Sequence, residues 1–361
     1  MAAEPKIVDL QQRMDRSQVV PDAARPAEPL QFFWANEVQP VLNGQFVVKN
    51  VIQLGSLIVV FGESNSGKTF FVLDLVLAVA GGQFWRGRKV TRGLVVYIAG
   101  EGTDGIKNRV AAYQTRGLSE RGIPLAIIKR AADLLHADGD MAGLLASVRA
   151  AETGSGEKCA LIVVDTLARA MAGGDENSGE DMSALIANAD RLRILTGAAV
   201  MLIHHCGKDA SKGARGHSSL RGAVDTEICI EGQTGRRTAT VTKQRDLPSG
   251  QVFGFELELQ VLGHDEDGDP VTSCIVRHLD DGQAFKTRPK SKQQLLILNA
   301  LESRQRDASK PLLWSIEDLT PLLKDLGVTH RNSRRAAMMG LVEGGYLESV
   351  GGCYSIKQGC T

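Results

Sequence analysis

The sequence predicts an α/β fold built around a largely parallel β-sheet, and three observations carry this prediction. Short apolar runs recur along the chain, and segments with helical spacing of apolar residues separate them. The runs are nearly continuous instead of alternating, which is typical of strands that a parallel sheet buries on both faces. Alternation of strand and helix in turn favours right-handed crossover connections within one sheet.

The predicted elements follow one another regularly as far as residue 205. The strands are LIVVF (57–61), LVVYIA (94–99), CALIVVD (159–165) and AVMLIHH (199–205), and the helices cover 67–79, 105–116 and 180–196. Beyond Thr226, short turns rich in Gly or Asp separate the segments EICIE, RRTATVTK, VFGFELELQVL and PVTSCIVRHL. Such spacing predicts an antiparallel extension of the same sheet.

The chain divides into three predicted parts. Residues 1–30 are polar, contain four prolines and lack periodicity, which predicts a flexible tail. Residues 31–286 hold the α/β domain. Residues 287–361 show three helical segments followed by two short strands around Gly351 and Gly352, a hairpin signal. Three helices and a hairpin resemble a winged-helix domain.

Composition excludes several classes of protein. Lys and Arg together number 42 and Asp and Glu number 42, so no global charge attracts nucleic acid. Six scattered cysteines without a C-x-x-C pair argue against a zinc site and against a disulfide framework. No apolar run approaches the roughly 18 residues that span a bilayer. With no apolar segment near the N-terminus, we expect a cytoplasmic protein without membrane contact.

The first strand leads into a phosphate-binding loop. Its sequence GESNSGKT fits G-x-x-x-x-G-K-[ST] without mismatch, between a predicted strand and a predicted helix. Backbone N–H groups of such a loop surround a phosphate, the Lys reaches the β- and γ-phosphates, and the hydroxyl binds Mg²⁺. We therefore expect ATP and Mg²⁺ to bind at Gly62, Glu63, Ser64, Asn65, Ser66, Gly67, Lys68, Thr69 and the following Phe70.

Polar residues stand at the ends of the other predicted strands. Asp165 ends an apolar strand after the phosphate loop, the Walker B arrangement that orients Mg²⁺. An N-cap or turn Asp has the same appearance. Glu101 follows the strand 94–99, and His204 and His205 end the strand 199–205. Because side chains alternate along a strand, only one of the two histidines can point toward a nucleotide.

A K-x-R pair ends a later strand. Lys243 and Arg245 project on one face because side chains alternate along a strand. These strand-end residues also have interpretations without a function. Glu101 could be a solvated loop residue, the two histidines could be surface residues, and the K-x-R pair could be an exposed basic strand end.

Together these segments resemble a known family. The loop Gly62–Thr69 with VVYIAGEG, LIVVDTLARAMAGGDENSGEDM, VMLIHHCGKD, SSLRGAVD and TKQRD is similar to the RepA-like branch of the RecA-fold ATPases, over roughly residues 35–280. That branch includes hexameric replicative helicases of plasmids and related ATPases of phages and mobile elements. The resemblance implies a RecA-like core, assembly into a hexameric or other ring, Mg²⁺-ATP hydrolysis between subunits, and single-stranded DNA in the central channel.

The resemblance also implies roles for individual residues. Glu101 would polarise the attacking water, and one of His204 and His205 would sense the γ-phosphate. Lys243 and Arg245 would reach the γ-phosphate of a neighbouring subunit, where a cation stabilises transition-state charge. With Lys68, these residues form the predicted catalytic set, and Thr69 and Asp165 form the predicted metal site.

Two basic regions are candidate DNA contacts. The segment GKDASKGARGHSSLRG after the histidines carries Lys208, Lys212, Arg215 and Arg221 and has no aromatic residue. At the start of the last predicted helix stand Arg331, Arg334 and Arg335, which in a winged helix would face the major groove. A surface loop and a protein-contact module are the alternatives.

Four functions fit this sequence to different degrees. A DNA-dependent helicase motor accounts for the K-x-R pair and the basic segment, and it would need replication or recombination proteins as partners. A RecA-fold ATPase acting as a recombination or regulatory switch or loader accounts for the same motifs without unwinding. A small-molecule kinase leaves the K-x-R pair unexplained, and a non-enzymatic regulator has no need of Glu101.

Overall fold

A computed structural model describes residues 34–38, 40, 42, 44–101, 103–114, 122–136, 138–206, 214–232, 236–279, 291–306, 312–343 and 346–356. The chain separates into two compact units, Met1–Gly44 and Gln45–Thr361. In the first unit, the described residues include the short 3-10 helix η1 (Ala35–Glu37). The predicted tail 1–30 lies outside the described residues. The boundaries predicted at 31–286 and 287–361 stay predictions.

One large sheet organises the second unit. Among the described residues it contains nine strands, in the order β11-β10-β9-β8-β3-β7-β6-β4-β5. Six of them run parallel: β3 (Leu57–Gly62), β4 (Leu94–Ala99), β5 (Leu125–Ile128), β6 (Cys159–Asp165), β7 (Ala199–His205) and β8 (Thr226–Glu231). The antiparallel strands are β9 (Arg237–Gln244), β10 (Val252–His264) and β11 (Pro270–His278). The predicted α/β class with a mostly parallel sheet is confirmed.

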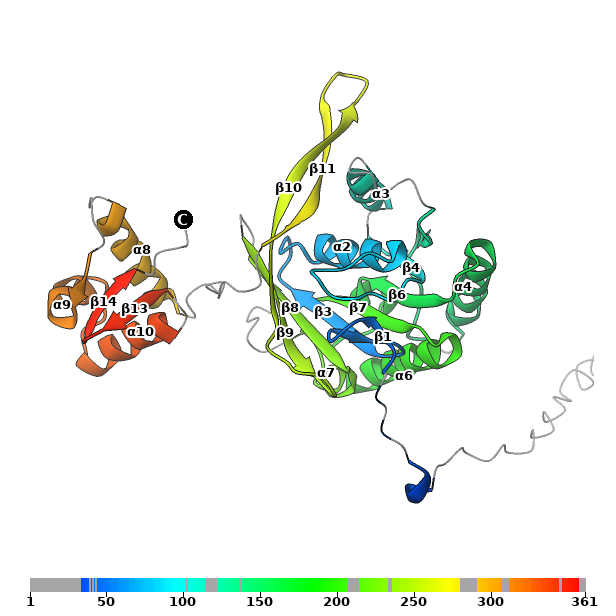
Figure 1. Ribbon diagram of the computed structural model, residues 1–361, viewed down its shortest axis with the longest axis horizontal. Coiled ribbons are helices and arrows are strands. Elements are labelled where there is room, and N and C mark those ends of the chain that lie inside the picture. Colours follow the sequence, from blue (N-terminus) through cyan, green and yellow to red (C-terminus); the bar gives the residue numbers. More distant parts are fainter. Residues whose placement is uncertain are drawn as a thin grey trace, which may run out of the picture. The chain divides into compact units, whose positions relative to one another are not determined.

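Helices cover both faces of this sheet (Figure 1). On one face α2 (Lys68–Gly81) and α3 (Thr103–Tyr113) pack on a cluster that includes Phe71, Val76 and Ile106. On the other face α4 (Met141–Ser155) and α6 (Gly179–Thr196) pack on a second cluster that includes Leu144 and Leu185. The strands β3, β4 and β6 are buried along their whole length. Burial on both faces explains why their sequences are continuous apolar runs.

Two short helices and a small sheet complete the α/β part. The helix α5 (Leu167–Ala170) follows β6, and the helix α7 (Ser219–Ala223) precedes β8. The small sheet pairs β1 (Phe46–Val48) with β2 (Ile52–Gln53) in antiparallel fashion.

The structure corrects one prediction and adds elements. The segment EICIE was predicted to start the antiparallel extension, but β8 runs parallel to β3, with Ile58 beside Thr226 and Gly62 beside Ile230. The extension therefore begins at β9. The predicted helix 105–116 corresponds to α3, and the strand β5 and the helix α4 stand between α3 and β6, where no element was predicted.

The C-terminal part has its own core, formed by residues such as Leu301, Leu323 and Met338. It contains α8 (Lys292–Arg306), α9 (Ile316–Asp325) and α10 (Arg331–Glu343), with β12 (Trp314–Ser315), β13 (Leu347–Val350) and β14 (Cys353–Ile356) in the order β12-β14-β13. Three helices and a hairpin occur as predicted, and the assignment to the winged-helix class stays a prediction. In the part of the chain that the structure describes, no helix has both the length and the apolarity needed to cross a membrane.

Candidate functional site

The phosphate loop leaves the carboxyl end of β3 and enters α2. Gly67 has φ +92° and Asn65 has φ +63°, so the chain turns sharply and directs successive N–H groups inward. A Cβ atom at Gly62 would lie 2.3 Å from the carbonyl oxygen of Ile230, so only glycine fits beside β8. The helix α2 begins at Lys68 with its positive end at this loop. The geometry is that of an anion-binding loop.

Lys68 is folded onto the loop that precedes it. Its Nζ donates to the carbonyl oxygens of Gly62 at 3.0 Å and Glu63 at 2.8 Å, and the residue is 7% exposed. Burial lowers the pKa of Lys68, while the nearby Cys206, Asp165 and Glu101 act in the opposite direction. The ammonium group is thus held inside the loop, at the place where a β- or γ-phosphate would accept its hydrogen bonds.

Asp165 lies against the start of α2. Its Oδ2 accepts hydrogen bonds from Thr69 Oγ1 at 3.2 Å and from the Tyr97 hydroxyl at 2.6 Å. Burial raises the pKa of Asp165, and the hydrogen bonds from Tyr97 and Thr69 oppose this rise. A carboxylate and a hydroxyl side by side are oxygen donors of the kind Mg²⁺ prefers. Among the described residues no group of three or more His, Cys, Asp or Glu could hold a metal.

Glu101 stands at the same edge of the sheet. The strands β4 and β6 pair with Ala99 beside Asp165, so Glu101 follows β4 next to the Walker B position. Its Oε1 accepts from Thr166 Oγ1 at 3.1 Å and lies 3.6 Å from Arg169 Nε. Two side chains therefore orient this half-exposed carboxylate.

The two histidines point to opposite faces of β7. His204 is fully buried, and its Nε2 donates to the Arg215 carbonyl oxygen at 2.7 Å and lies 3.7 Å from Glu176 Oε2. Burial lowers the pKa of His204. By alternation, His205 shares the face of Ile203, which belongs to the cluster that packs on α2. His205 is therefore on the side of the phosphate-loop helix, and His204 is on the other side.

Lys243 and Arg245 lie at the opposite edge of the sheet. Lys243 stands beside Glu227 in the β8–β9 pair, and Thr226 stands beside Ile58, near the start of β3. The phosphate loop follows the other end of β3, after Gly62. The structure therefore does not bring the K-x-R pair to this chain's own phosphate loop.

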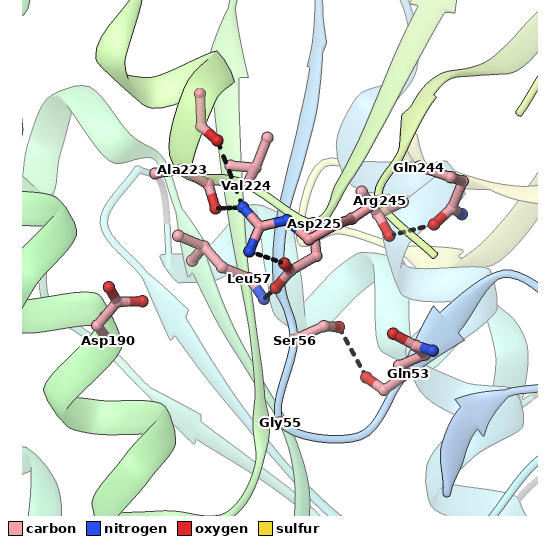
Figure 2. Close-up of polar contacts among 12 residues, drawn as sticks. Gln53, Gly55, Ser56, Leu57, Asp190, Ala223, Val224, Asp225, Gln244 and Arg245 are labelled. Carbon is pink, nitrogen blue, oxygen red and sulfur yellow. Dashed lines mark hydrogen bonds and ion pairs between the residues drawn. The ribbon is translucent and has the colours of Figure 1, made fainter. Parts of the chain in front are cut away.

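Both cations lie against the C-terminal end of α7, and Figure 2 shows Arg245 beside Ala223 and Asp225. Lys243 Nζ donates to the carbonyl oxygens of Arg221 at 2.5 Å and Val224 at 2.8 Å. Arg245 donates to the Ala223 carbonyl at 3.0 Å and pairs with Asp225 at 3.1 Å. Cations at a helix C-terminus satisfy carbonyls that lack partners within the helix. The Arg245 side chain is nevertheless 50% exposed, so a second molecule can reach it.

The candidate DNA contacts are dispersed. Lys208 and Lys212 lie outside the described residues. Arg215 pairs with Glu176 at 2.5 Å, and Arg221 lies 3.6 Å from the buried Glu227. In the C-terminal part, Arg331, Arg334 and Arg335 occupy the first turns of α10, where Arg331 and Arg335 are exposed and Arg334 is partly buried.

Three site residues escaped prediction. Tyr97 is the only hydroxyl in its buried strand, a signal that it needs a partner. Glu176 links the loop after β6 to the segment after β7 through Arg215. Arg109 on α3 lies 4.8 Å over the Phe70 ring, and its charge opposes the rise that burial causes in the pKa of Asp165. The pairings of Glu176 and Arg109 leave no sequence signal.

Comparison with known proteins shows the family of the chain. A sequence model described as an AAA domain matches residues 23–211, more than half of the chain. No curated protein matches. The crystal structure of a KaiC-like protein from the hyperthermophilic archaeon Pyrococcus horikoshii OT3 is similar with a TM-score of 0.40 and 15% identity, over 65% of this chain and 99% of that one. The chain belongs to the AAA domain family of P-loop ATPases.

Proposed function

We propose that this protein is a DNA-dependent, ring-forming ATPase that hydrolyses Mg²⁺-ATP between its subunits. The closest functional class by motif is a RepA-like replicative DNA helicase of a phage, plasmid or mobile element, which translocates on single-stranded DNA. The nucleotide would bind at the phosphate loop of one copy, and the next copy would complete the site. Single-stranded DNA and replication or recombination proteins are the proposed partners.

The observation that carries the proposal is the separation of the K-x-R pair from the phosphate loop. The loop follows Gly62, whereas Lys243 lies at the level of the start of β3. A cation that stabilises charge on the γ-phosphate must contact it. In this chain the pair can do so only at the site of a second copy, and a head-to-tail contact of this kind closes into a ring.

Within one copy, the remaining parts of a hydrolytic site lie at one edge. Lys68 would bind the β- and γ-phosphates, and Glu101 would orient the attacking water because Thr166 and Arg169 fix its carboxylate. Thr69 and Asp165 would hold Mg²⁺, which supplies charge neutralisation on the phosphates when bound. We assign the γ-phosphate sensor to His205, since His204 is buried on the other face with its Nε2 engaged by Arg215.

The alternative is an ATPase that switches or loads without unwinding. The observation that favours it is that two arginines of the basic segment lie beside acidic residues of the same chain. Arg215 is paired with Glu176, and Arg221 lies beside Glu227, so these cations are not simply available to a DNA backbone. A regulatory ATPase needs the site between copies but no tracking of DNA.

The experiment that tests the proposal is the ATPase rate with and without single-stranded DNA. We expect a rate of at least several-fold above the basal one when an oligonucleotide is added. Lys68→Ala serves as the inactive control because it removes the phosphate-binding ammonium. Absence of stimulation would contradict DNA dependence. Stimulation without displacement of a strand from a forked duplex would favour the switch over the helicase.

A further inference from the structure

A turn between α2 and β4 carries a cluster of cations that the ATPase site does not use. The N–H of Trp85 donates to the Arg88 carbonyl at 3.0 Å, and the N–H of Arg88 donates to the Trp85 carbonyl at 2.9 Å. Arg86 and Gly87 form the tip with φ +49° and +72°. This backbone suits Asn-Gly, and an arginine in the left-handed region is uncommon. The turn therefore places an arginine where the backbone conformation disfavours one.

Packing fixes the side chains of this turn. The Arg86 guanidinium lies 5.5 Å from the ring centre of Trp85 and donates to the Gly254 carbonyl at 2.9 Å. Arg88 lies 4.9 Å over Phe253 and donates to Gln251 at 3.3 Å. Ring faces and the oxygens of Gly254 and Gln251 thus hold both guanidinium groups in place.

Two exposed lysines extend the positive surface. The N–H of Lys49, in the turn between β1 and β2, donates to the carbonyl of Lys89 at 3.0 Å, which fixes the two turns side by side. In the part of the chain that the structure describes, neither Lys49 nor Lys89 forms an ion pair. From Gln83 to Gly93 the sequence has four basic residues and no acidic one. Of these four, the Arg92 guanidinium pairs with Glu157 at 2.9 Å.

An exposed aromatic residue flanks the same turn. Trp85 and Arg88 form an antiparallel bridge, so Phe84 and Lys89 are the next opposed pair of residues. Phe84 is 66% exposed, although its neighbour Trp85 is 1% exposed. A ring face in water next to unpaired lysines is the combination that binds single-stranded nucleic acid, because bases stack on the ring while phosphates contact the cations. An acidic protein would use the lysines but would gain nothing specific from the ring.

We propose that Lys49, Phe84 and Lys89 form a binding surface for single-stranded nucleic acid. The two lysines contact backbone phosphates, and Phe84 stacks with an unpaired base. This surface is separate from the segment after β7 and from α10, and its binding does not require ATP hydrolysis.

The test uses the full chain and a fluorescent oligothymidylate, with affinity measured by anisotropy at several salt concentrations. Lys49→Gln with Lys89→Gln should weaken binding several-fold and reduce the salt slope by roughly 1.4, about 0.7 per lost phosphate contact on a single strand. Phe84→Leu should weaken binding on the order of 10-fold without changing the slope. Duplex DNA, whose bases are already stacked, should not respond to Phe84→Leu.

The matched control is Lys107→Gln with Lys158→Gln. These lysines are also exposed, but they lie beside Asp104 and Glu152, so the same loss of charge should leave affinity and slope near those of the wild type. Equal effects of the two double variants would overturn the proposal, as would a wild type that binds no oligonucleotide. A Phe84→Leu variant with full affinity, or competition by oligoglutamate as effective as by oligothymidylate, would assign the surface to an acidic protein instead. Mass measurements must show unchanged assembly, since a change would place the lysines in a subunit contact.

Discussion

At the scale of single residues, the Walker B position depends on hydrogen bonds from buried neighbours. Asp165 is 8% exposed and accepts from both Thr69 and Tyr97. Tyr97 is fully buried, and burial raises its pKa, so its hydroxyl stays a donor. Tyr97 therefore orients the carboxylate that would hold Mg²⁺ without contacting the nucleotide itself.

Tyr97→Phe should loosen the orientation of Asp165 while keeping the ring in the core. We expect the Mg²⁺ concentration for half-maximal ATPase to rise on the order of 10-fold, as for other groups that orient a metal ligand. The control is Tyr113→Phe, which removes a buried hydroxyl that accepts from the Val276 N–H far along the chain. Unchanged Mg²⁺ dependence in Tyr97→Phe, or an equal change in the control, would show that the Tyr97 hydroxyl does not orient Asp165 for Mg²⁺ binding.

His204 gives a prediction on pH. Its pKa is lowered by burial, so the folded protein binds this proton less readily than the unfolded chain does. The contribution of His204 to stability is therefore fully present above the unfolded pKa, about 6.5, and is lost as the pH falls from there toward the folded pKa.

We expect His204→Gln, whose amide can still donate to the Arg215 carbonyl, to show a smaller drop in unfolding free energy between pH 7 and lower pH than the wild type. Urea unfolding at a series of pH values measures this. Identical drops in the two proteins would show that His204 does not titrate on unfolding.

At the scale of elements, the junction of α7 and β8 ties the K-x-R pair to the start of the central strand. Asp225 Oδ2 accepts from the Leu57 N–H at 2.9 Å, and its Oδ1 pairs with Arg245 at 3.1 Å (Figure 2). Arg193 of α6 approaches the same carboxylate at 4.0 Å. One carboxylate thus connects three elements beneath the exposed Arg245.

Asp225→Asn should destabilise the protein by about 1–3 kcal/mol. The substitution removes the charge of a largely buried carboxylate that accepts a hydrogen bond from a backbone N–H and lies close to two arginines. Urea unfolding measures this cost. Asp246→Asn is the control, since Asp246 is exposed one residue after Arg245 and should cost almost nothing. A cost equal to that of the control would show that the junction does not depend on this carboxylate.

The sequence predicted elements well where burial is complete. The strands β3, β4, β6 and β7 are almost wholly buried, and their apolar runs therefore predict them. β5 is only partly buried at the sheet edge, and α4 buries just three of its residues, so both have weak patterns and were missed. The direction of β8 depends on which strand it joins, and no local pattern contains that information.

The site was predictable to the same extent. Gly62, Lys68, Thr69, Asp165 and Glu101 belong to motifs, and the structure brings them to one edge. The placement of Arg109 over Phe70 and the pairing of Arg215 with Glu176 join segments that are far apart in sequence, so spacing could not reveal them.

At the scale of the whole molecule, the two edges of the sheet carry complementary halves of the proposed ATPase site. One edge presents the phosphate loop, Asp165 and Glu101, and the other presents Lys243 and Arg245, whose side chains contact the C-terminal end of α7. Neither edge is sufficient for hydrolysis if the account is correct. Activity must then depend on contact between copies and rise with protein concentration.

Mixing two inactive variants tests whether two copies share one ATPase site. Glu101→Gln keeps the K-x-R pair but lacks the proposed base, and Arg245→Gln keeps Glu101 but lacks the trans cation. Lys243→Gln serves as a second partner if Arg245→Gln unfolds through loss of its pairing with Asp225. In a random one-to-one mixture, about a quarter of head-to-tail interfaces would combine the two intact halves. We expect each variant alone to be inactive and the mixture to recover a corresponding part of the wild-type ATPase rate. Full activity of Arg245→Gln and Lys243→Gln alone, or no recovery in mixtures that assemble, would contradict a site shared between copies.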